Sequence, residues 1–116
     1  MYHAIKSLYE NIKCRIKLNN GFGFTDAFPV SIGLKQGCKL SPSLFNIYIN
    51  DLCTKMNSLQ RGIKIGNQQV SMLLYADDVI LISHSATSLQ MMLDCLHRWC
   101  TKWQMGISEK KTQIVK

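Results

Sequence analysis

The sequence predicts an α+β fold, because short apolar runs rich in β-forming residues occur beside two apolar stripes at helical spacing. The runs occupy 72–75 and 79–82, one stripe follows Ser41, and the other lies within 88–103. The chain has 116 residues, of which 47% are hydrophobic, which suits one small domain or a part of one. We therefore expect an antiparallel β-hairpin packed on two main helices.

Two adjacent carboxylates, Asp77 and Asp78, interrupt the apolar run from Ser71 to Ser83. The segments on either side are typical of strands, so the pair is expected at the bend of a hairpin. Burying an ionised carboxylate costs several kcal/mol unless it is paired or bound to a metal, and two neighbours also repel each other. We therefore expect a cation there, and a hard ion such as Mg²⁺ prefers such oxygen ligands. The alternative is an ordinary turn, where Asp is common.

A glycine-containing loop precedes the first long helix. Ser41 and Pro42 are typical of an N-cap and a first helical residue. Apolar residues then recur at helical spacing, namely Leu44, Phe45, Tyr48, Ile49 and Leu52. In the loop, Gly33 and Gly37 permit a positive φ or a close backbone approach, and Gln36 offers a donor and an acceptor. Such a loop can lie against a nucleotide or a sugar-phosphate backbone, or simply connect into the helix.

The second stripe predicts a helix from about Ser88 to Trp103. Its members are Leu89, Met92, Leu93, Leu96, Cys100 and Trp103, widened by Cys95 and Trp99. We expect these side chains to pack in a core, so truncation of Trp103 is expected to cost several kcal/mol.

Weaker patterns place the remaining elements. A short stripe predicts a helix within Met1 to Ile12. Polar and apolar residues alternate from Cys14 to the Asn20-Gly21 turn signal, and 25–32 is expected to return as the partner strand, with Pro29 at an edge. Gly66-Asn67 predicts a further hairpin turn that leads into the strand before the Asp pair.

Together, the loop-and-helix segment and the Asp pair resemble the palm of reverse transcriptases, most closely those of non-LTR (LINE-like) retrotransposons. Gly33 to Leu52 is similar to that family's motif with Gln-Gly and Leu-Ser-Pro at its centre, and Tyr75-Ala-Asp-Asp78 to its aromatic-Ala-Asp-Asp metal motif. Lys111-Thr112 matches the family's Lys-Thr pair, although Ser108 stands where the family usually has Asn. The resemblance covers 1–116 as a partial reverse transcriptase domain, a partial polymerase palm that begins just after the first carboxylate motif.

The resemblance implies an RNA-directed DNA polymerase that transfers nucleotides to a primer 3′-hydroxyl by two-metal catalysis with Mg²⁺ or Mn²⁺. It implies metal-binding and catalytic roles for Asp77 and Asp78, and protonation of the leaving pyrophosphate by Lys111. Residues implied to contact template or nucleotide are Lys35, Gln36, Gly37 and Tyr75. The implied partners are an RNA template, a DNA primer and deoxynucleoside triphosphates.

The family's third carboxylate normally lies upstream of the Gln-Gly loop, and no matching segment occurs here. Asp26 falls in the predicted first hairpin and Glu10 on the predicted first helix, so neither replaces it. We therefore expect a fragment that is inactive alone and needs the missing upstream and downstream polymerase segments. The alternative is a non-catalytic retrotransposon remnant that at most binds nucleic acid through its basic surface. A maturase-like or telomerase-like relative is a weaker alternative, since these share the palm.

Composition agrees with a nucleic-acid partner, because the net charge of +7 favours phosphate contacts. The basic residues are spread along the chain and define no single patch, so a solvated basic surface is the alternative. Five cysteines without Cys-x-x-Cys spacing indicate neither a disulfide framework nor a zinc site, which suggests an intracellular, reducing location in cytoplasm or nucleus. No run approaches the length of a membrane span, so no membrane partner is expected.

Overall fold

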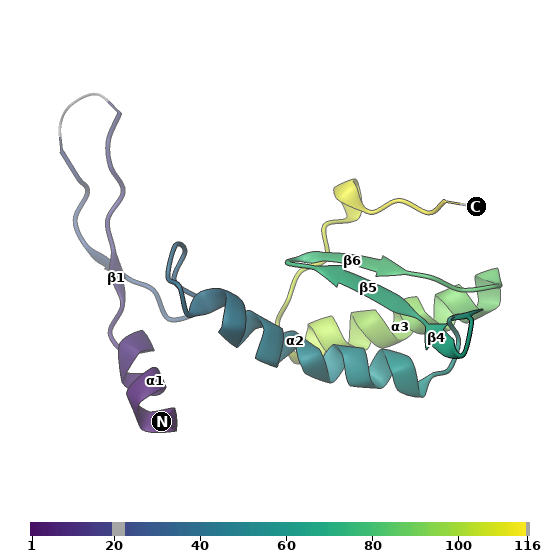
Figure 1. Ribbon diagram of the computed structural model, residues 1–116. Coiled ribbons are helices and arrows are strands. Elements are labelled where there is room, and N and C mark those ends of the chain that lie inside the picture. The colour runs from purple at the N-terminus through teal and green to yellow at the C-terminus, as the bar shows by residue number, and fades with distance from the viewer. Residues whose placement is uncertain (20–22, 116) are drawn as a thin grey trace. The chain divides into compact units, whose positions relative to one another are not determined.

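The computed structural model describes residues 1–19 and 23–115. They fall into two compact units, Met1–Phe45 and Asn46–Lys116. The elements, labelled in part in Figure 1, are α1 (Tyr2–Tyr9), β1 (Lys13–Cys14), β2 (Phe28–Pro29), α2 (Ser41–Ser58), β3 (Ile63–Ile65), β4 (Gln68–Val70), β5 (Met72–Tyr75), β6 (Asp78–Leu81), α3 (Ala86–Lys102) and a 3₁₀ turn, η1 (Glu109–Lys111). The strands of the described residues form three antiparallel pairs, so the α+β class predicted from the sequence is confirmed.

The first unit contains α1, the β1–β2 hairpin and the loop that enters α2. In the hairpin, Lys13 is opposite Pro29 and Cys14 is opposite Phe28, and an isolated bridge joins Lys17 to Phe24. The regular strand β2 covers only part of the expected return strand over 25–32, although backbone hydrogen bonds from Thr25 to Ile16 and from Val30 to Ile12 extend the pairing on both sides of it. With only two strands, Pro29 lies at an edge, as predicted. The expected turn at Asn20-Gly21 lies outside the described residues.

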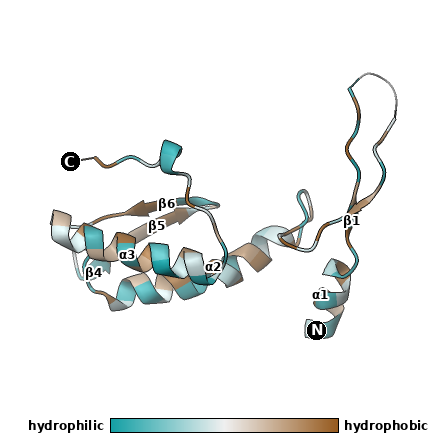
Figure 2. Ribbon diagram, turned by 180° about the vertical axis from the view of Figure 1, so that it is seen from behind, coloured by the Kyte–Doolittle hydropathy of each residue, from teal (hydrophilic) through white to brown (hydrophobic). Residues whose placement is uncertain are grey.

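The second unit places the β5–β6 hairpin along α2 and α3 (Figure 1). Its core consists of side chains less than a tenth exposed, namely Ile49, Leu52, Met56, Met92, Trp99 and Cys100. In Figure 2, β5 and β6 are mostly brown, that is hydrophobic, whereas α2 and α3 show both hydrophobic and hydrophilic residues. The β3–β4 hairpin turns at Gly66-Asn67, as predicted, and leads through Ser71 into β5.

The packing of α3 differs from the predicted stripe at its end. Trp99, which was expected only to widen the stripe, is 2% exposed, whereas Trp103 is 39% exposed. The helix ends at Lys102 and Trp103 is its C-cap, so the last turn no longer holds this side chain against the core. The expectation that Trp103 is a core residue was wrong, and Trp99 has that place.

Trp99 also joins the two helices through a polar contact. Its indole Nε1 donates to Oδ2 of Asp51 on α2 at 3.0 Å, and the Asp51 carboxylate also pairs with Lys55 at 3.2 Å. The hydrogen bond from Trp99, and then the ammonium of Lys55, lower the pKa of the Asp51 carboxyl below its ordinary value of 3.8. The buried indole N–H is thereby satisfied, which an apolar neighbour would not achieve.

This lowered pKa predicts a pH dependence of stability. The ionised Asp51 stabilises the folded state fully above the unfolded-state value of 3.8 and loses this contribution as pH falls through the lower folded-state pKa. We expect Asp51→Asn to destabilise the chain at neutral pH, and the difference from wild type to shrink as pH falls below 3.8. Urea midpoints of both proteins across the acid range measure this. A difference that stays constant through that range would refute the assignment.

None of the helices in the described part of the chain combines the length and apolar character that crossing a membrane requires.

Candidate functional site

The Asp pair lies at the tip of the β5–β6 hairpin. Tyr75 is paired with Asp78, so the connection is a two-residue turn made of Ala76 and Asp77. Ala76 has φ +53, which is uncommon for a residue with a side chain and is usually left to glycine in such turns. Strained turns of this kind occur where neighbouring side chains must be held in a particular place. The turn presents Asp77 at its second position and Asp78 at the first position of β6.

The strand sequences explain why the tip protrudes from a packed element. Met72 and Leu74 on β5 are half-buried, as are Val79 and Leu81 on β6, so one face of the hairpin packs inward. The other face carries the directly opposed pair Leu73 and Ile80, which are 50% and 57% exposed. This alternation is that of a strand pair with one buried face.

The two carboxylates themselves are exposed, which corrects the first reason for expecting a cation there. No side chain of the described residues hydrogen-bonds to Asp77 or Asp78 or forms an ion pair with them. Water can therefore solvate both groups, and burial does not require a cation. What fits a hard divalent ion is the donor set, since two adjacent carboxylates have all their oxygens available. The part of the chain that the structure describes holds no group of three potential metal ligands.

The Gln-Gly loop belongs to the first unit and is organised around Tyr9 and Ser41. Lys35 places its Nζ 5.6 Å from the centre of the Tyr9 ring, a cation–π contact. The Ser41 hydroxyl donates to the Lys35 carbonyl at 2.7 Å and lies 3.3 Å from the Tyr9 hydroxyl. Gly33 and Gly37 have φ of +98 and +78, so the glycines occupy conformations that other residues avoid.

Ser41 does not have the capping role predicted from the sequence. The helix already includes Ser41, and the first helical hydrogen bond runs from the Leu44 N–H to the Leu40 carbonyl at 3.1 Å. The Ser41 hydroxyl is engaged by the loop carbonyl of Lys35 instead. A local N-cap signal was therefore overridden by a contact within the loop, and the serine fixes the loop that precedes the helix.

Cys38 is a residue of this loop to which the sequence assigned no role. Its pKa is lowered, chiefly by the hydrogen bond from the Leu40 backbone N–H, with further contributions from Ser41 and Tyr9. The contribution of Tyr9 could not be predicted from the sequence, because Tyr9 is far from Cys38 along the chain. The contacts tie the start of α2 to the end of α1.

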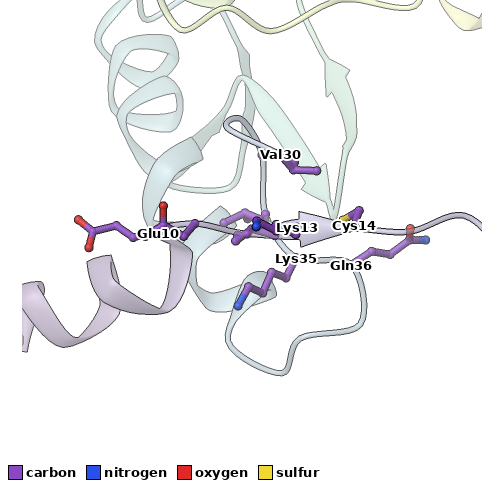
Figure 3. Close-up of a pocket in the computed structure, with 10 residues that line it drawn as sticks. Glu10, Lys13, Cys14, Val30, Lys35 and Gln36 are labelled. Atoms are coloured by element: carbon purple, nitrogen blue, oxygen red, sulfur yellow. The ribbon is translucent and has the colours of Figure 1, made fainter. Parts of the chain in front are cut away.

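A groove of about 640 Å³ lies beside the loop. Its walls are the segments 10–14 and 33–36 together with Val30. Figure 3 shows Lys13 and Cys14 on β1, and the Lys35 and Gln36 side chains extending from the loop in opposite directions. Lys35 and Gln36, predicted from the resemblance to contact template or nucleotide, both line this groove.

Lys111 lies in the second unit, at the end of η1. The backbone N–H of Lys111 donates to the Ser108 carbonyl at 3.1 Å, and the Thr112 hydroxyl donates to the same carbonyl at 2.9 Å. Ser108 thus supports a regular turn despite differing from the family's usual Asn. No direct contact joins the exposed Lys111 to the Asp pair within the described residues.

The predicted site residues other than Lys111 therefore form two groups. Tyr75, Asp77 and Asp78 are together at the hairpin tip of the second unit. Lys35 and Gln36 line the groove of the first unit, with Gly37 next in the loop. Each group has the residue types for one task, namely cation binding at the tip and nucleotide or phosphate contact in the groove.

A family model described as reverse transcriptase (RNA-dependent DNA polymerase) matches residues 2–116. The chain therefore belongs to the reverse transcriptase family, as its motifs predicted.

The curated proteins that are similar to this chain include polymerases of retrotransposable elements. It is 37% identical over 76 residues to the Pol polyprotein of the type-2 retrotransposable element R2DM of Drosophila melanogaster, covering 65% of this chain and 7% of that protein. It is 26% identical over 118 residues to the RNA-directed DNA polymerase from mobile element jockey of the same species, covering 96% of this chain and 12% of that protein. A telomerase reverse transcriptase of Oryza sativa is 30% identical over 112 residues, covering 90% of this chain and 8% of that protein. The chain thus spans only a small part of these relatives.

Proposed function

We propose that this chain is part of the palm of an RNA-directed DNA polymerase, and that Asp77 and Asp78 are two of its three metal-binding carboxylates. The observation that carries the proposal is the exposed Asp pair at the tip of the β5–β6 hairpin, separated from the aromatic Tyr75 by Ala76 alone. The motif occurs in a chain that matches the reverse transcriptase family over nearly its whole length. The substrates would be a primed RNA template and deoxynucleoside triphosphates.

Each of the predicted site residues would have its own role in this reaction. Asp77 and Asp78 supply the negative oxygen ligands at the tip, and bound Mg²⁺ or Mn²⁺ would lower the pKa of the primer 3′-hydroxyl and neutralise triphosphate charge. Lys35 offers a cation and Gln36 an amide to the template or nucleotide, while Gly37 leaves room for close approach. Tyr75, 83% exposed beside Asp78, offers a surface for stacking. Lys111 would donate a proton to the leaving pyrophosphate.

The third carboxylate is expected from outside these residues. Asp26 lies in the first hairpin and Glu10 directly follows α1, where it pairs with Lys6 at 3.7 Å, so neither belongs to the hairpin tip. We expect the isolated 116-residue chain to give no primer extension on a primed RNA template with Mg²⁺ or Mn²⁺. Extension by the purified chain that Asp77→Asn abolishes would show that the catalytic set is complete without another segment.

A second candidate is a non-catalytic remnant that only binds nucleic acid. It is favoured by the net charge of +7, which does not depend on the Asp pair. The two candidates differ in what Asp77→Asn changes. If the chain is a non-catalytic remnant, wild type and Asp77→Asn bind RNA equally and neither binds a divalent ion at the hairpin tip. If the chain is a polymerase segment, wild type binds the ion at the tip, and Asp77→Asn loses ion binding while RNA binding is unchanged.

A further inference from the structure

Three cations occupy alternate positions of the strand that contains β1. Lys13, Arg15 and Lys17 are all exposed. The strand is paired well beyond β1, from the Ile12 carbonyl, which accepts from the Val30 N–H at 2.9 Å, to the Leu18 N–H, which donates to the Gly23 carbonyl at 3.0 Å. Because side chains alternate between faces of a strand, the three cations share one face.

The second strand of this hairpin contains a β-bulge. Cys14 is opposite Phe28, but Lys17 is opposite Phe24, so the second strand carries one extra residue between these pairs. The extra residue falls at Asp26-Ala27, opposite Arg15. Thr25 fixes the register beside it, since its N–H donates to the Ile16 carbonyl at 2.9 Å and its hydroxyl accepts from the Ile16 N–H at 3.0 Å. Such bulges re-aim side chains and set the strand twist.

The charge of this face stays positive. Asp26 is the carboxylate that the paired strand contributes near Arg15, and it forms no ion pair in the described part of the chain. Phe24, directly opposite Lys17, is 62% exposed on the same face. The other face carries Cys14, Ile16, Leu18 and Phe28. We call Lys13, Arg15, Lys17 and Phe24 the cationic face.

The cationic face begins at the groove beside the Gln-Gly loop. Lys13 lines that groove together with Lys35 and Gln36. Arg15 and Lys17 continue the row along the hairpin. Cations at alternate strand positions are about 6.7 Å apart, a spacing that suits successive phosphates of a stretched single strand. Cations combined with an exposed aromatic ring are typical of single-strand binding surfaces.

We propose that the cationic face binds the backbone of a single-stranded polynucleotide and leads it into the groove lined by Lys35 and Gln36. The inference deepens the proposed function, on which it rests, by assigning the strand's path within the first unit. Lys13, Arg15 and Lys17 would each contact a phosphate, and Phe24 would stack on a base.

The test is binding of a labelled single-stranded RNA of about 12 nucleotides to the full chain, measured by fluorescence anisotropy over a range of salt concentration. The variant Lys13→Gln/Arg15→Gln/Lys17→Gln, which we call the row variant, removes the three cations of the cationic face. The matched control Lys6→Gln/Lys64→Gln/Arg98→Gln removes the same charge from exposed positions elsewhere. The charge-preserving variant Lys13→Arg/Arg15→Lys/Lys17→Arg and circular dichroism of all variants separate binding from folding.

We expect the row variant to lower the salt slope of log affinity by about 2, since each phosphate contact on a single strand contributes about 0.7. The corresponding loss is about 100-fold at about 0.1 M salt. The control is expected to lose less than a third of that slope, and the charge-preserving variant to bind as wild type does. Phe24→Ala is expected to weaken binding about fivefold with an unchanged slope.

Three results would overturn the inference: no RNA binding by the wild-type chain, an equal loss in the row and control variants, or displacement of the RNA by polyglutamate at equal charge concentration. Asp77→Asn keeps these outcomes apart from those of the proposed function. It is expected to bind RNA normally and to lose the metal effect at the hairpin tip. A metal effect that Asp77→Asn leaves unchanged, with RNA binding by the cationic face intact, would refute the polymerase role alone.

Discussion

Trp99→Ala is expected to destabilise the second unit by about 3–5 kcal/mol, a large part of the stability of a typical domain. The side chain is 2% exposed and contacts Tyr48 edge-on at 5.6 Å between ring centres. Truncation leaves a cavity between α2 and α3 and also removes the donor to Asp51. Urea unfolding followed by circular dichroism measures the loss.

Trp103→Ala is the matched control, because it removes the same side chain from a position 39% exposed. Its ring contacts Tyr48 at 5.2 Å and carries Lys102 over its face at 5.2 Å, and we expect a cost of about 1 kcal/mol. The Tyr48 hydroxyl donates to the Trp103 backbone carbonyl at 2.9 Å, a bond that alanine keeps. A larger loss from Trp103→Ala than from Trp99→Ala would restore the core position that the sequence pattern suggested.

Gly62→Ala is expected to cost about 3 kcal/mol or more, the upper end of overpacking effects. Gly62 directly precedes β3 and is buried against the link between β4 and β5. A Cβ at Gly62 would overlap the Val70 carbonyl and lie 2.6 Å from the Ser71 Cα. These are backbone atoms, so no rotamer change relieves the clash. Ser71 is itself held, since its hydroxyl donates to Asn57 Oδ1 at 2.9 Å. The displaced segment leads directly into the hairpin that carries the Asp pair.

Gly106→Ala is the control for the glycine substitution. A Cβ at this position meets nothing within 4 Å, and the backbone is not in the left-handed region. We expect a change within about 0.5 kcal/mol, or a small stabilisation through the unfolded state. Thermal unfolding of the two variants compares them directly. Equal midpoints would mean that the close approach at Gly62 is not a constraint on folding.

The elements with strong periodic patterns were predictable. Both long helices and the β5–β6 hairpin were expected near their observed places, because their apolar spacing reflects the faces they bury. Ser41 and Trp103 were misassigned, since both depend on contacts that local sequence does not encode. Ser41 bonds to the Lys35 carbonyl instead of capping, and Trp103 follows a helix that ends one residue before it.

The position of the Asp pair in the fold was predictable, whereas its environment was not. Asp77 and Asp78 lie at the hairpin tip as expected, yet they are exposed, because the two-residue turn carries them beyond the half-buried strand positions. The contact of Lys35 with Tyr9 and the row of Lys13, Arg15 and Lys17 needed the structure. Basic residues look scattered along a sequence until strand pairing puts them on one face.

The most direct test of the central claim, that the hairpin tip is a divalent cation site, is Mn²⁺-induced broadening of backbone amide NMR signals in the wild-type chain and in two variants. We expect selective broadening around 75–78 in wild type, no selective broadening in Asp77→Asn, and a weaker effect in Asp78→Asn if Asp78 is the outer ligand. Mg²⁺ should reverse the broadening by competition. Equal broadening in all three proteins would contradict the metal site, and with it the polymerase function proposed for this chain.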